Sequence, residues 1–299
     1  MNKLFTGVSF LLIASVIACN PKKDSNDLEN AVILYAAARI ATCSVPGTTV
    51  SNASATLNTG TGCINGLTTS MDAALPDWIK NNFKCSVGQV SGSTYILRSQ
   101  NIPNTKSFYF GSSSPMYEAL PSGHKSAGNN QIQAQCLVYS IPSVPTVKTG
   151  AKTSTQAGYV SVGITTNGLA IFNNAAAPPD TLAAEVTTFD NFNGHPQNTG
   201  VYHHHALPKN LSDETNGDAN LLGILLDGYA VYGEKCDNGT QNPGDDTVPN
   251  NLDSNHGHTT TTVHFTTATY HYHYTLDNTA TIKTLIGGSF HGTPGTVSN

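Results

Sequence analysis

The chain has 299 residues and a formal net charge of −5, and only 11% of its residues are charged. No run of Lys or Arg occurs, which excludes the basic surface that nucleic acid requires as a partner. Ser, Thr, Asn and Gly dominate the polar positions, a composition typical of exported β-proteins with many turns. The length is enough for one large β domain or two small ones.

The N-terminus has the pattern of an export signal. A short basic start precedes the apolar run from Leu4 to Ala18, which is too short to span a membrane. The run ends in Val16-Ile17-Ala18-Cys19, which resembles a bacterial lipobox. This resemblance implies a signal peptide at residues 1–18 and palmitate-type acylation of Cys19, whereas an ordinary signal peptide with a chance cysteine is the alternative. Asn20 is not the acidic residue associated with inner-membrane retention. We therefore expect a lipoprotein anchored in the cell envelope, at the outer membrane rather than the inner.

Residues 19–90 are expected to form a tether and a helical N-terminal region. Leu28–Ala41 has high helix propensity, and Met71–Phe83 places apolar residues at four-residue spacing, with Pro76 in the first turn.

From residue 91 the apolar pattern changes to a period of two, which predicts strands. Two of these runs are joined by the turn-like pair Asp227-Gly228. No internal repeat of fixed period is visible. We expect a mainly β domain over residues 91–299, an antiparallel sandwich or barrel. Its predicted strands cover residues 94–97, 107–110, 133–141, 158–165, 169–172, 202–205, 221–226, 229–232 and 270–274.

Five cysteines remain besides Cys19, and an exported protein tends to oxidise them to disulfides. An odd number leaves at least one outside an internal disulfide. One arrangement among several pairs Cys43 with Cys63 and Cys85 with Cys136, leaving Cys236 as the thiol.

Histidines gather in the second half of the chain, where two strand-like blocks each contain His-x-His. Residues two apart on a strand face the same side. His203 and His205 are therefore neighbours on one face, as are His271 and His273, and His204 and Tyr272 point away. Neutral imidazoles from neighbouring strands are common ligands of transition metals.

The sequence thus predicts one copper or zinc ion held by both His-x-His pairs. In the alternative, the imidazoles hydrogen-bond to backbone and carboxylates in a polar core. His258 and His195 are candidates for further metal ligands. Asp190, Asp227, Tyr202 and Tyr272 are candidates for positions around the ligands, where Asp190 or Asp227 would orient an imidazole.

Several ordered motifs over residues 91–292 are similar to the YHYH-domain family. They include Gly200–Pro208, Leu226–Gly233 and Tyr270–His273, together with Asn167–Phe172 and Gly194-His195-Pro196. The resemblance implies an exported bacterial domain and a set of candidate positions rather than a reaction. This chain departs from the family pattern in its first block, which reads Tyr-His-His-His.

Three functions stay open at this point. The first is a metal-binding envelope protein, the second a metal-dependent enzyme that activates water or oxygen, and the third a surface interaction protein with a structural His/Tyr network. An open coordination position in a concave pocket would favour the enzyme, and closed four-coordination a structural ion. No His-Glu-x-x-His, Gly-x-Ser-x-Gly or Walker-type motif is present.

Overall fold

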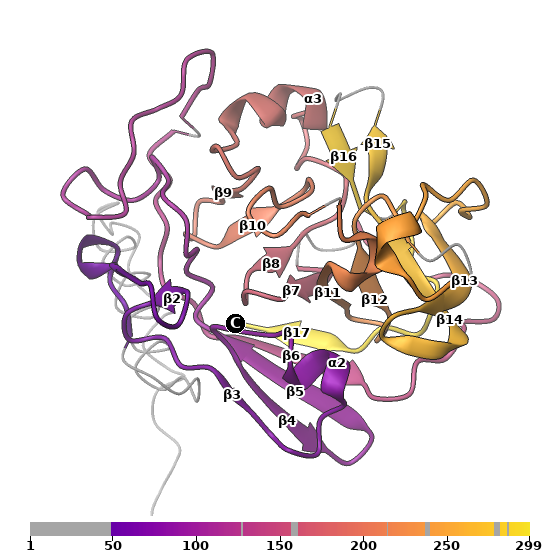
Figure 1. Ribbon diagram of the computed structural model, residues 1–299. Helices are drawn as coiled ribbons and strands as arrows, with labels where there is room; N and C mark the ends of the chain where they lie inside the picture. The colour runs from indigo at the N-terminus through magenta and orange to yellow at the C-terminus, as the bar shows by residue number, and fades with distance from the viewer. Residues whose placement is uncertain are drawn as a thin grey trace, which may run out of the picture. The chain divides into compact units, whose positions relative to one another are not determined.

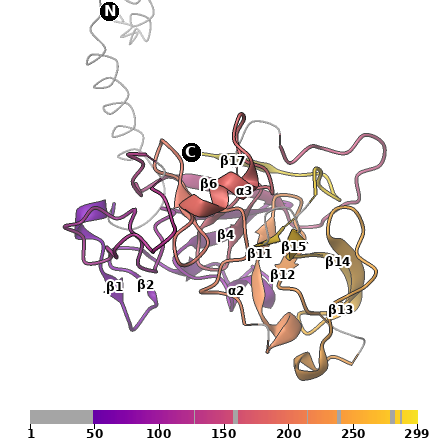
Figure 2. The same ribbon diagram turned by 90° about the horizontal axis from the view of Figure 1, so that it is seen from above.

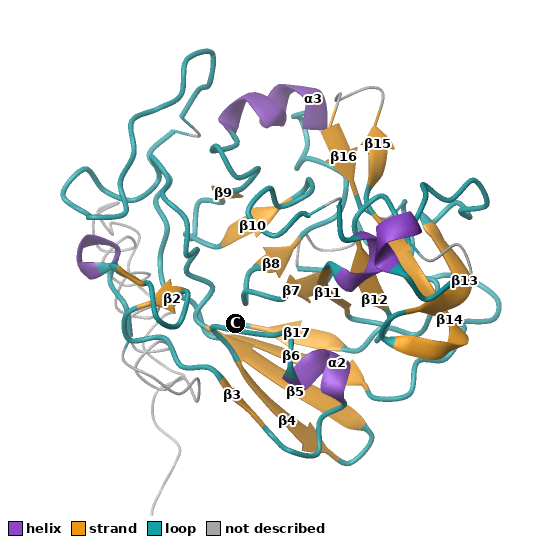
Figure 3. Cartoon of the chain, viewed as in Figure 1, coloured by secondary structure: helices purple, strands orange, loops and turns teal. Residues whose placement is uncertain are grey.

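The computed structural model describes residues 49–126, 128–156, 161–213, 215–236, 240–277, 282–285 and 287–299. Strands dominate the described secondary structure, in antiparallel and mixed sheets, which confirms the predicted mainly β class (Figure 3). Among these residues, no helix has the length and apolar character needed to cross a membrane. Residues 44–299 group as one compact unit, and the expected boundary at residue 90 falls inside a strand.

Within the described ranges, helix is limited to single turns. The helix expected over Leu28–Ala41 lies outside the described residues. The one expected over Met71–Phe83 is only α2, because Pro76 is its N-cap and disfavours helical backbone at the preceding residue. The described helices are α2 (Asp77–Lys80) and α3 (Leu182–Glu185), and the 3-10 turns are η1 (Asn52–Ser54), η3 (Val186–Thr188), η4 (Gly217–Ala219) and η5 (Pro243–Asp245).

A five-stranded sheet has the order β17-β6-β5-β4-β3. The strand expected at Ser107–Phe110 is wrong, because the Ser107 side chain accepts the backbone N–H of Tyr109 and the segment turns. The strands of this sheet are β3 (Ser70–Met71), β4 (Val87–Ser91), β5 (Thr94–Ser99), β6 (Leu137–Pro142) and β17 (Thr296–Ser298).

An eight-stranded sheet has the order β13-β14-β12-β11-β7-β8-β10-β9 (Figure 1). It is mixed, because β8 pairs parallel with β10 and β12 pairs parallel with β14. Its strands are β7 (Gly163–Thr165), β8 (Ala170–Ile171), β9 (His195–Pro196), β10 (Tyr202–His204), β11 (Leu221–Leu225), β12 (Ala230–Tyr232), β13 (Gly257–Thr262) and β14 (Phe265–His273).

Two small hairpins complete the set, β1 (Leu57–Asn58) with β2 (Cys63–Ile64) and β15 (Thr275–Asp277) with β16 (Ile282–Thr284). The largest apolar core contains residues of both large sheets, for example Leu97 and Tyr139 from one and Ile164 and Ile224 from the other. All four are fully buried. Figure 2 shows the same elements from above.

The eight-stranded sheet consists of two similar halves. Ile164 and Ile224 pair at its centre, and the β7–β8 and β11–β12 hairpins lie back to back around that pair. A Cβ added to Gly163 would lie 2.5 Å from the carbonyl oxygen of Ile224, and one added to Gly223 would lie 2.5 Å from that of Ile164. Glycine at these two positions allows the halves to approach.

Each half continues in the same way, with one long connection and then an antiparallel strand pair, β9 with β10 and β13 with β14. We name residues 163–205 copy 1 and residues 223–273 copy 2. The two copies form an internal repeat without a fixed period, which is consistent with the absence of a fixed-period repeat in the sequence. Equivalent positions are 60 residues apart at Gly163 and Gly223 but 68 apart at His203 and His271, because the connections differ in length.

The disulfide framework differs from the one expected. Cys63 is bonded to Cys85, with their Cα atoms 5.5 Å apart, so the pairings of Cys63 with Cys43 and of Cys85 with Cys136 are wrong. Cys136 is also in a disulfide. Cys236 keeps its thiol, as predicted, and is buried.

Candidate metal centres

The histidines predicted as ligands separate into two groups, one in each copy. Centre 1 consists of His195, His203 and His205. Centre 2 consists of Cys236, His258, His271 and His273. Within each centre, one potential ligand atom per residue lies within 4.8 Å of all the others. Four strands separate β10 from β14, so the prediction of a single ion bound by both His-x-His pairs is wrong.

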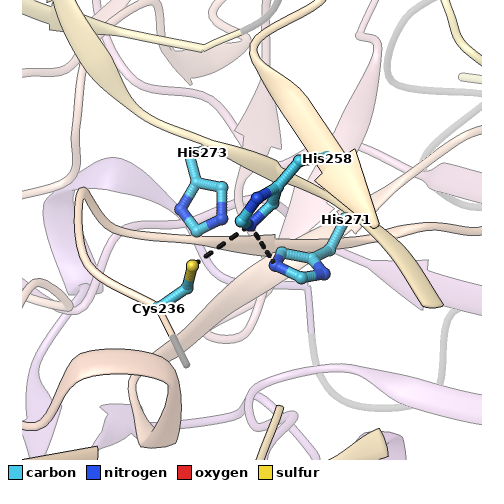
Figure 4. Close-up of side chains that lie close together, drawn as sticks. All are labelled: Cys236, His258, His271 and His273. Carbon is cyan, nitrogen blue, oxygen red and sulfur yellow. Dashed lines mark hydrogen bonds between the residues drawn. The ribbon is translucent and has the colours of Figure 1, made fainter. Parts of the chain in front are cut away.

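Equivalent strands position the two sets of imidazoles. In copy 1, the strand period places His203 and His205 on one face, and His195 on β9 pairs directly with His203. In copy 2, His258 on β13 pairs with His271 on β14 in the same manner. Cys236 approaches from the segment after β12, and Figure 4 shows its sulfur directed at the three imidazoles.

Hydrogen bonds fix the tautomer of each imidazole in centre 1. The Nδ1 atoms of His203 and His205 lie 3.0 and 2.6 Å from the carbonyl oxygens of Val201 and Asn173. A carbonyl only accepts, so both Nδ1 atoms carry the proton. The Nδ1 of His195 lies 2.8 Å from Thr188 Oγ1, whose own proton is donated to the carbonyl of Glu185. All three rings therefore present Nε2 without a proton when they are neutral.

Centre 2 repeats this arrangement. His271 and His273 donate Nδ1–H to the carbonyls of Thr269 and Gly233, at 2.9 and 2.7 Å. Thr269 and Gly233 occupy the places of Val201 and Asn173 in copy 1. The Nδ1 of His258 lies 2.8 Å from the side-chain oxygen of Asn251. Again the three Nε2 atoms are left as acceptors that face one another.

The facing Nε2 atoms are close together. The Nε2 atoms of His203 and His205 are 3.0 Å apart, and those of His258 and His271 are 3.1 Å apart. The Cys236 sulfur lies 3.1 Å from the Nε2 of His258. Two lone pairs at this distance repel each other unless a cation lies between them. The Nε2 atoms of His195 and His273 are buried without a hydrogen-bond partner, which also leaves them ready to ligate.

Burial keeps these imidazoles neutral. Desolvation lowers the pKa of His205 to about 4. The pKa values of His195, His203 and His273 lie well below the ordinary value, mainly through desolvation and then through the neighbouring histidines. Proton bridging between the rings is thus disfavoured at neutral pH, and a metal ion is the cation that fits neutral imidazoles.

The aspartates expected to orient imidazoles bind tyrosine hydroxyls instead. Asp190 accepts the hydroxyl of Tyr202 at 2.8 Å, and Asp227 accepts that of Tyr272 at 2.5 Å. Asp253, which the sequence did not single out, accepts the hydroxyl of Tyr270 and is the copy 2 equivalent of Asp190. Asp190 and Asp253 each also accept two backbone N–H groups of the turn that ends at the glycine of the Gly-His pair. The carboxylates therefore hold the strands that carry the ligands, and backbone carbonyls orient the rings of the two His-x-His pairs.

The remaining predicted positions face away from the centres. The Nδ1 of His204 lies 2.9 Å from the carbonyl oxygen of Asn193, on the opposite side of β10 from His203. His204 and Tyr272 occupy equivalent positions in the two copies. Neither belongs to a candidate metal group, as the strand period predicts.

Centre 1 borders a cavity of about 640 Å³. All three imidazoles line it, and so do Phe172 and Glu185. The Glu185 carboxylate oxygens lie 3.8 Å from the Nε2 of His195 and 3.6 Å from that of His205. The four side chains of centre 2 are also buried, between 0% and 8% exposed, and none of them lines this cavity.

Sequence reasoning missed Glu185 and did not assign Cys236 to a metal. Glu185 lies on the short α3 in the connection between β8 and β9, and Cys236 lies in the connection that follows β12. An alignment of the sequences of the two copies would have shown that these two connections differ while the His positions on either side of them match.

Comparison with known proteins finds a match for one region of the chain. A family model described as YHYH protein matches residues 138–249, less than half of the chain. The match includes all of copy 1 and ends before Tyr270, so it is narrower than the resemblance over residues 91–292. No curated protein and no solved structure matches the chain. The chain contains a YHYH domain at residues 138–249.

Proposed function

We propose that this protein binds two divalent transition-metal ions, copper or zinc, one in each centre. The observation that carries the proposal is the set of opposed Nε2 atoms, 3.0 Å apart in centre 1 and 3.1 Å apart in centre 2. Bonds of about 2.0–2.1 Å to a tetrahedral ion would set ligand nitrogens roughly 3.3 Å apart. The imidazoles are therefore already spaced for a shared ion.

The ligand types suit the two metals. Three imidazoles with one thiolate in centre 2 give a set of four ligands whose types suit both zinc and copper. Such a closed, buried set is typical of an ion that stabilises the fold. Centre 1 offers three imidazoles and a nearby carboxylate.

We further propose that the domain acts in the cell envelope, held there by a lipid on Cys19. The lipobox-like Val16–Cys19 supports this location, and two or more acyl chains give stable anchoring.

Metal content of protein purified without an affinity tag tests the proposal. Elemental analysis should find two ions per chain in the wild type and one in each paired variant, His203→Ala/His205→Ala or His271→Ala/His273→Ala. His124→Ala, a histidine outside both centres, should keep two. Cobalt substitution adds an independent readout, because a thiolate-to-cobalt charge-transfer band reports centre 2 alone.

If the wild type holds no metal and takes up none after chelation and reloading, the proposal fails. The imidazoles would then belong to a structural His/Tyr network, and the domain would be an interaction protein.

A further inference from the structure

Centres 1 and 2 each contain three imidazoles on equivalent strands. They differ in what lies at the position of a fourth ligand. In centre 2 the segment after β12 turns inward, and Cys236 Sγ lies 3.1 Å from the Nε2 of His258. The residue 60 positions earlier, at the same offset as the two hairpins, is Ala176, which offers no ligand. Its neighbours Ala175 and Ala177 line the cavity beside centre 1.

The cavity beside centre 1 therefore lies where Cys236, the fourth protein ligand, lies in centre 2. Its volume of about 640 Å³ is typical of pockets that bind small molecules. Its wall also contains amide side chains, among them Asn130 and Gln197. These groups can bind a polar ligand through hydrogen bonds.

Glu185 lies at the rim of centre 1 with one oxygen unused. Its side chain is 20% exposed, and its Oε2 has no hydrogen-bond partner although that atom is buried. An acceptor at 3.6–3.8 Å from two Nε2 atoms is positioned to bind a proton donor on a group that coordinates the metal.

We propose that centre 1 holds its metal with open coordination positions and binds a small monoanionic oxygen-donor ligand from solution, such as a hydroxycarboxylate or a hydroxamate. This inference rests on the proposed metal binding. The cavity is also lined by the carboxylates of Glu185 and Asp180 and the ammonium of Lys125, so a divalent ion there leaves a net charge of about +1, which a monoanion neutralises. Zinc with three protein ligands accepts one or two further donors, so two adjacent ligand oxygens fit. The N–H or O–H of the ligand donates to Glu185.

Acetohydroxamate is the probe, because it offers two oxygen donors and one N–H. We would load the full chain with cobalt and titrate acetohydroxamate while recording the visible d–d bands and the thiolate charge-transfer band. The d–d bands should change saturably, whereas the charge-transfer band of the closed centre 2 should stay constant. His203→Ala/His205→Ala should abolish the change and keep the charge-transfer band, which also shows that the variant is folded.

Two single variants test the cavity and the carboxylate. Glu185→Gln should weaken acetohydroxamate binding by about tenfold, since a charged acceptor is lost. Ala184→Trp, at an exposed position on the cavity wall, should weaken binding by obstructing the cavity, with cobalt content unchanged.

Cobalt in both centres with no response of the d–d bands to acetohydroxamate would show that centre 1 is coordinatively closed, and would overturn this inference alone. A response that survives in His203→Ala/His205→Ala would place the open position elsewhere and overturn it too. Absence of cobalt from centre 1 would instead be a failure of the proposed function, which elemental analysis detects separately.

Discussion

Substitution of His271 by leucine, a residue of similar volume, separates metal binding from a purely structural role. His271 is fully buried, donates Nδ1–H to the carbonyl of Thr269 and faces the Nε2 of His258. Without metal, His271→Leu removes the repulsion between two opposed lone pairs, and it also removes a hydrogen bond worth about 1 kcal/mol. The two effects have opposite signs. We expect the chelated variant to be within about 1 kcal/mol of the chelated wild type.

With metal the expectation changes. An ion at 100 times its dissociation constant stabilises the folded state by about 2.7 kcal/mol per site. Loss of a ligand should lower affinity by at least the 10–100-fold seen when an outer partner of a metal ligand is removed. At the same metal concentration His271→Leu should then lose about 1–2 kcal/mol of this stabilisation. For a domain of this size that is a drop in Tm of about 2–8 °C.

Thermal unfolding followed by circular dichroism measures both conditions. The matched variant is His203→Leu in centre 1, because His203 occupies the equivalent position in copy 1, donates Nδ1–H to the carbonyl of Val201 and faces the Nε2 of His205. The two losses should add within about 0.5 kcal/mol, because four strands separate the centres. A loss of 2 kcal/mol or more in the chelated protein, unchanged by metal, would refute the reasoning and identify the imidazole as a structural hydrogen-bonding group.

Three further outcomes are expected. Alkylation without reduction should label Cys236 only after chelation and unfolding, because its side chain is 2% exposed, and labelling in the native protein, read by mass spectrometry, would contradict the enclosed centre. His204→Tyr, which installs the residue found at the equivalent Tyr272, should reduce the acid sensitivity of the chelated protein. Burial lowers the pKa of His204 to about 4, so its contribution to stability is complete above pH 6.5 and is lost as pH falls towards 4. Between pH 7 and 5, the free energy of unfolding measured with denaturant should fall by about 2 kcal/mol less in His204→Tyr than in the wild type. Equal decreases in the two proteins would refute this role of His204. Cys19→Ala should release the protein from the membrane fraction and abolish labelling by a fatty-acid analogue, and an unlabelled wild type would exclude the anchor.

Local patterns in the sequence predicted the parts of the fold that depend on neighbouring residues. The hairpin turn was predicted from the pair Asp227-Gly228. In the structure Gly228 adopts a positive φ of +90°, which glycine accommodates without strain. The face shared by His203 and His205 follows from the strand period alone. The short helix α2 and the turn at Ser107 were mispredicted, since a proline and a side-chain hydrogen bond overrode the apolar spacing.

Strand pairing could not be predicted in the same way. Whether His203 meets His271 or His195 depends on which strands are neighbours, and those contacts join residues far apart in the chain. The disulfide of Cys63 with Cys85 has the same origin, because it depends on where β2 lies relative to the start of β4. The repeat was missed because its period lengthens along the chain, although both copies contain Gly-His followed by Tyr-His-x-His.

The two copies show how one strand frame supports two kinds of centre. The carbonyls that orient the rings, of Val201 and Asn173 in copy 1 and of Thr269 and Gly233 in copy 2, belong to the backbone, so the frame tolerates changes of side chain. Beyond Asn173 and Gly233, the connections after β8 and β12 are under no such constraint. One leads to α3 and leaves a cavity, and the other returns Cys236 to the ligands. In the proposed function, divergence in these connections alone would therefore be sufficient to give one copy a buried ion that stabilises the domain and the other an ion open to ligands.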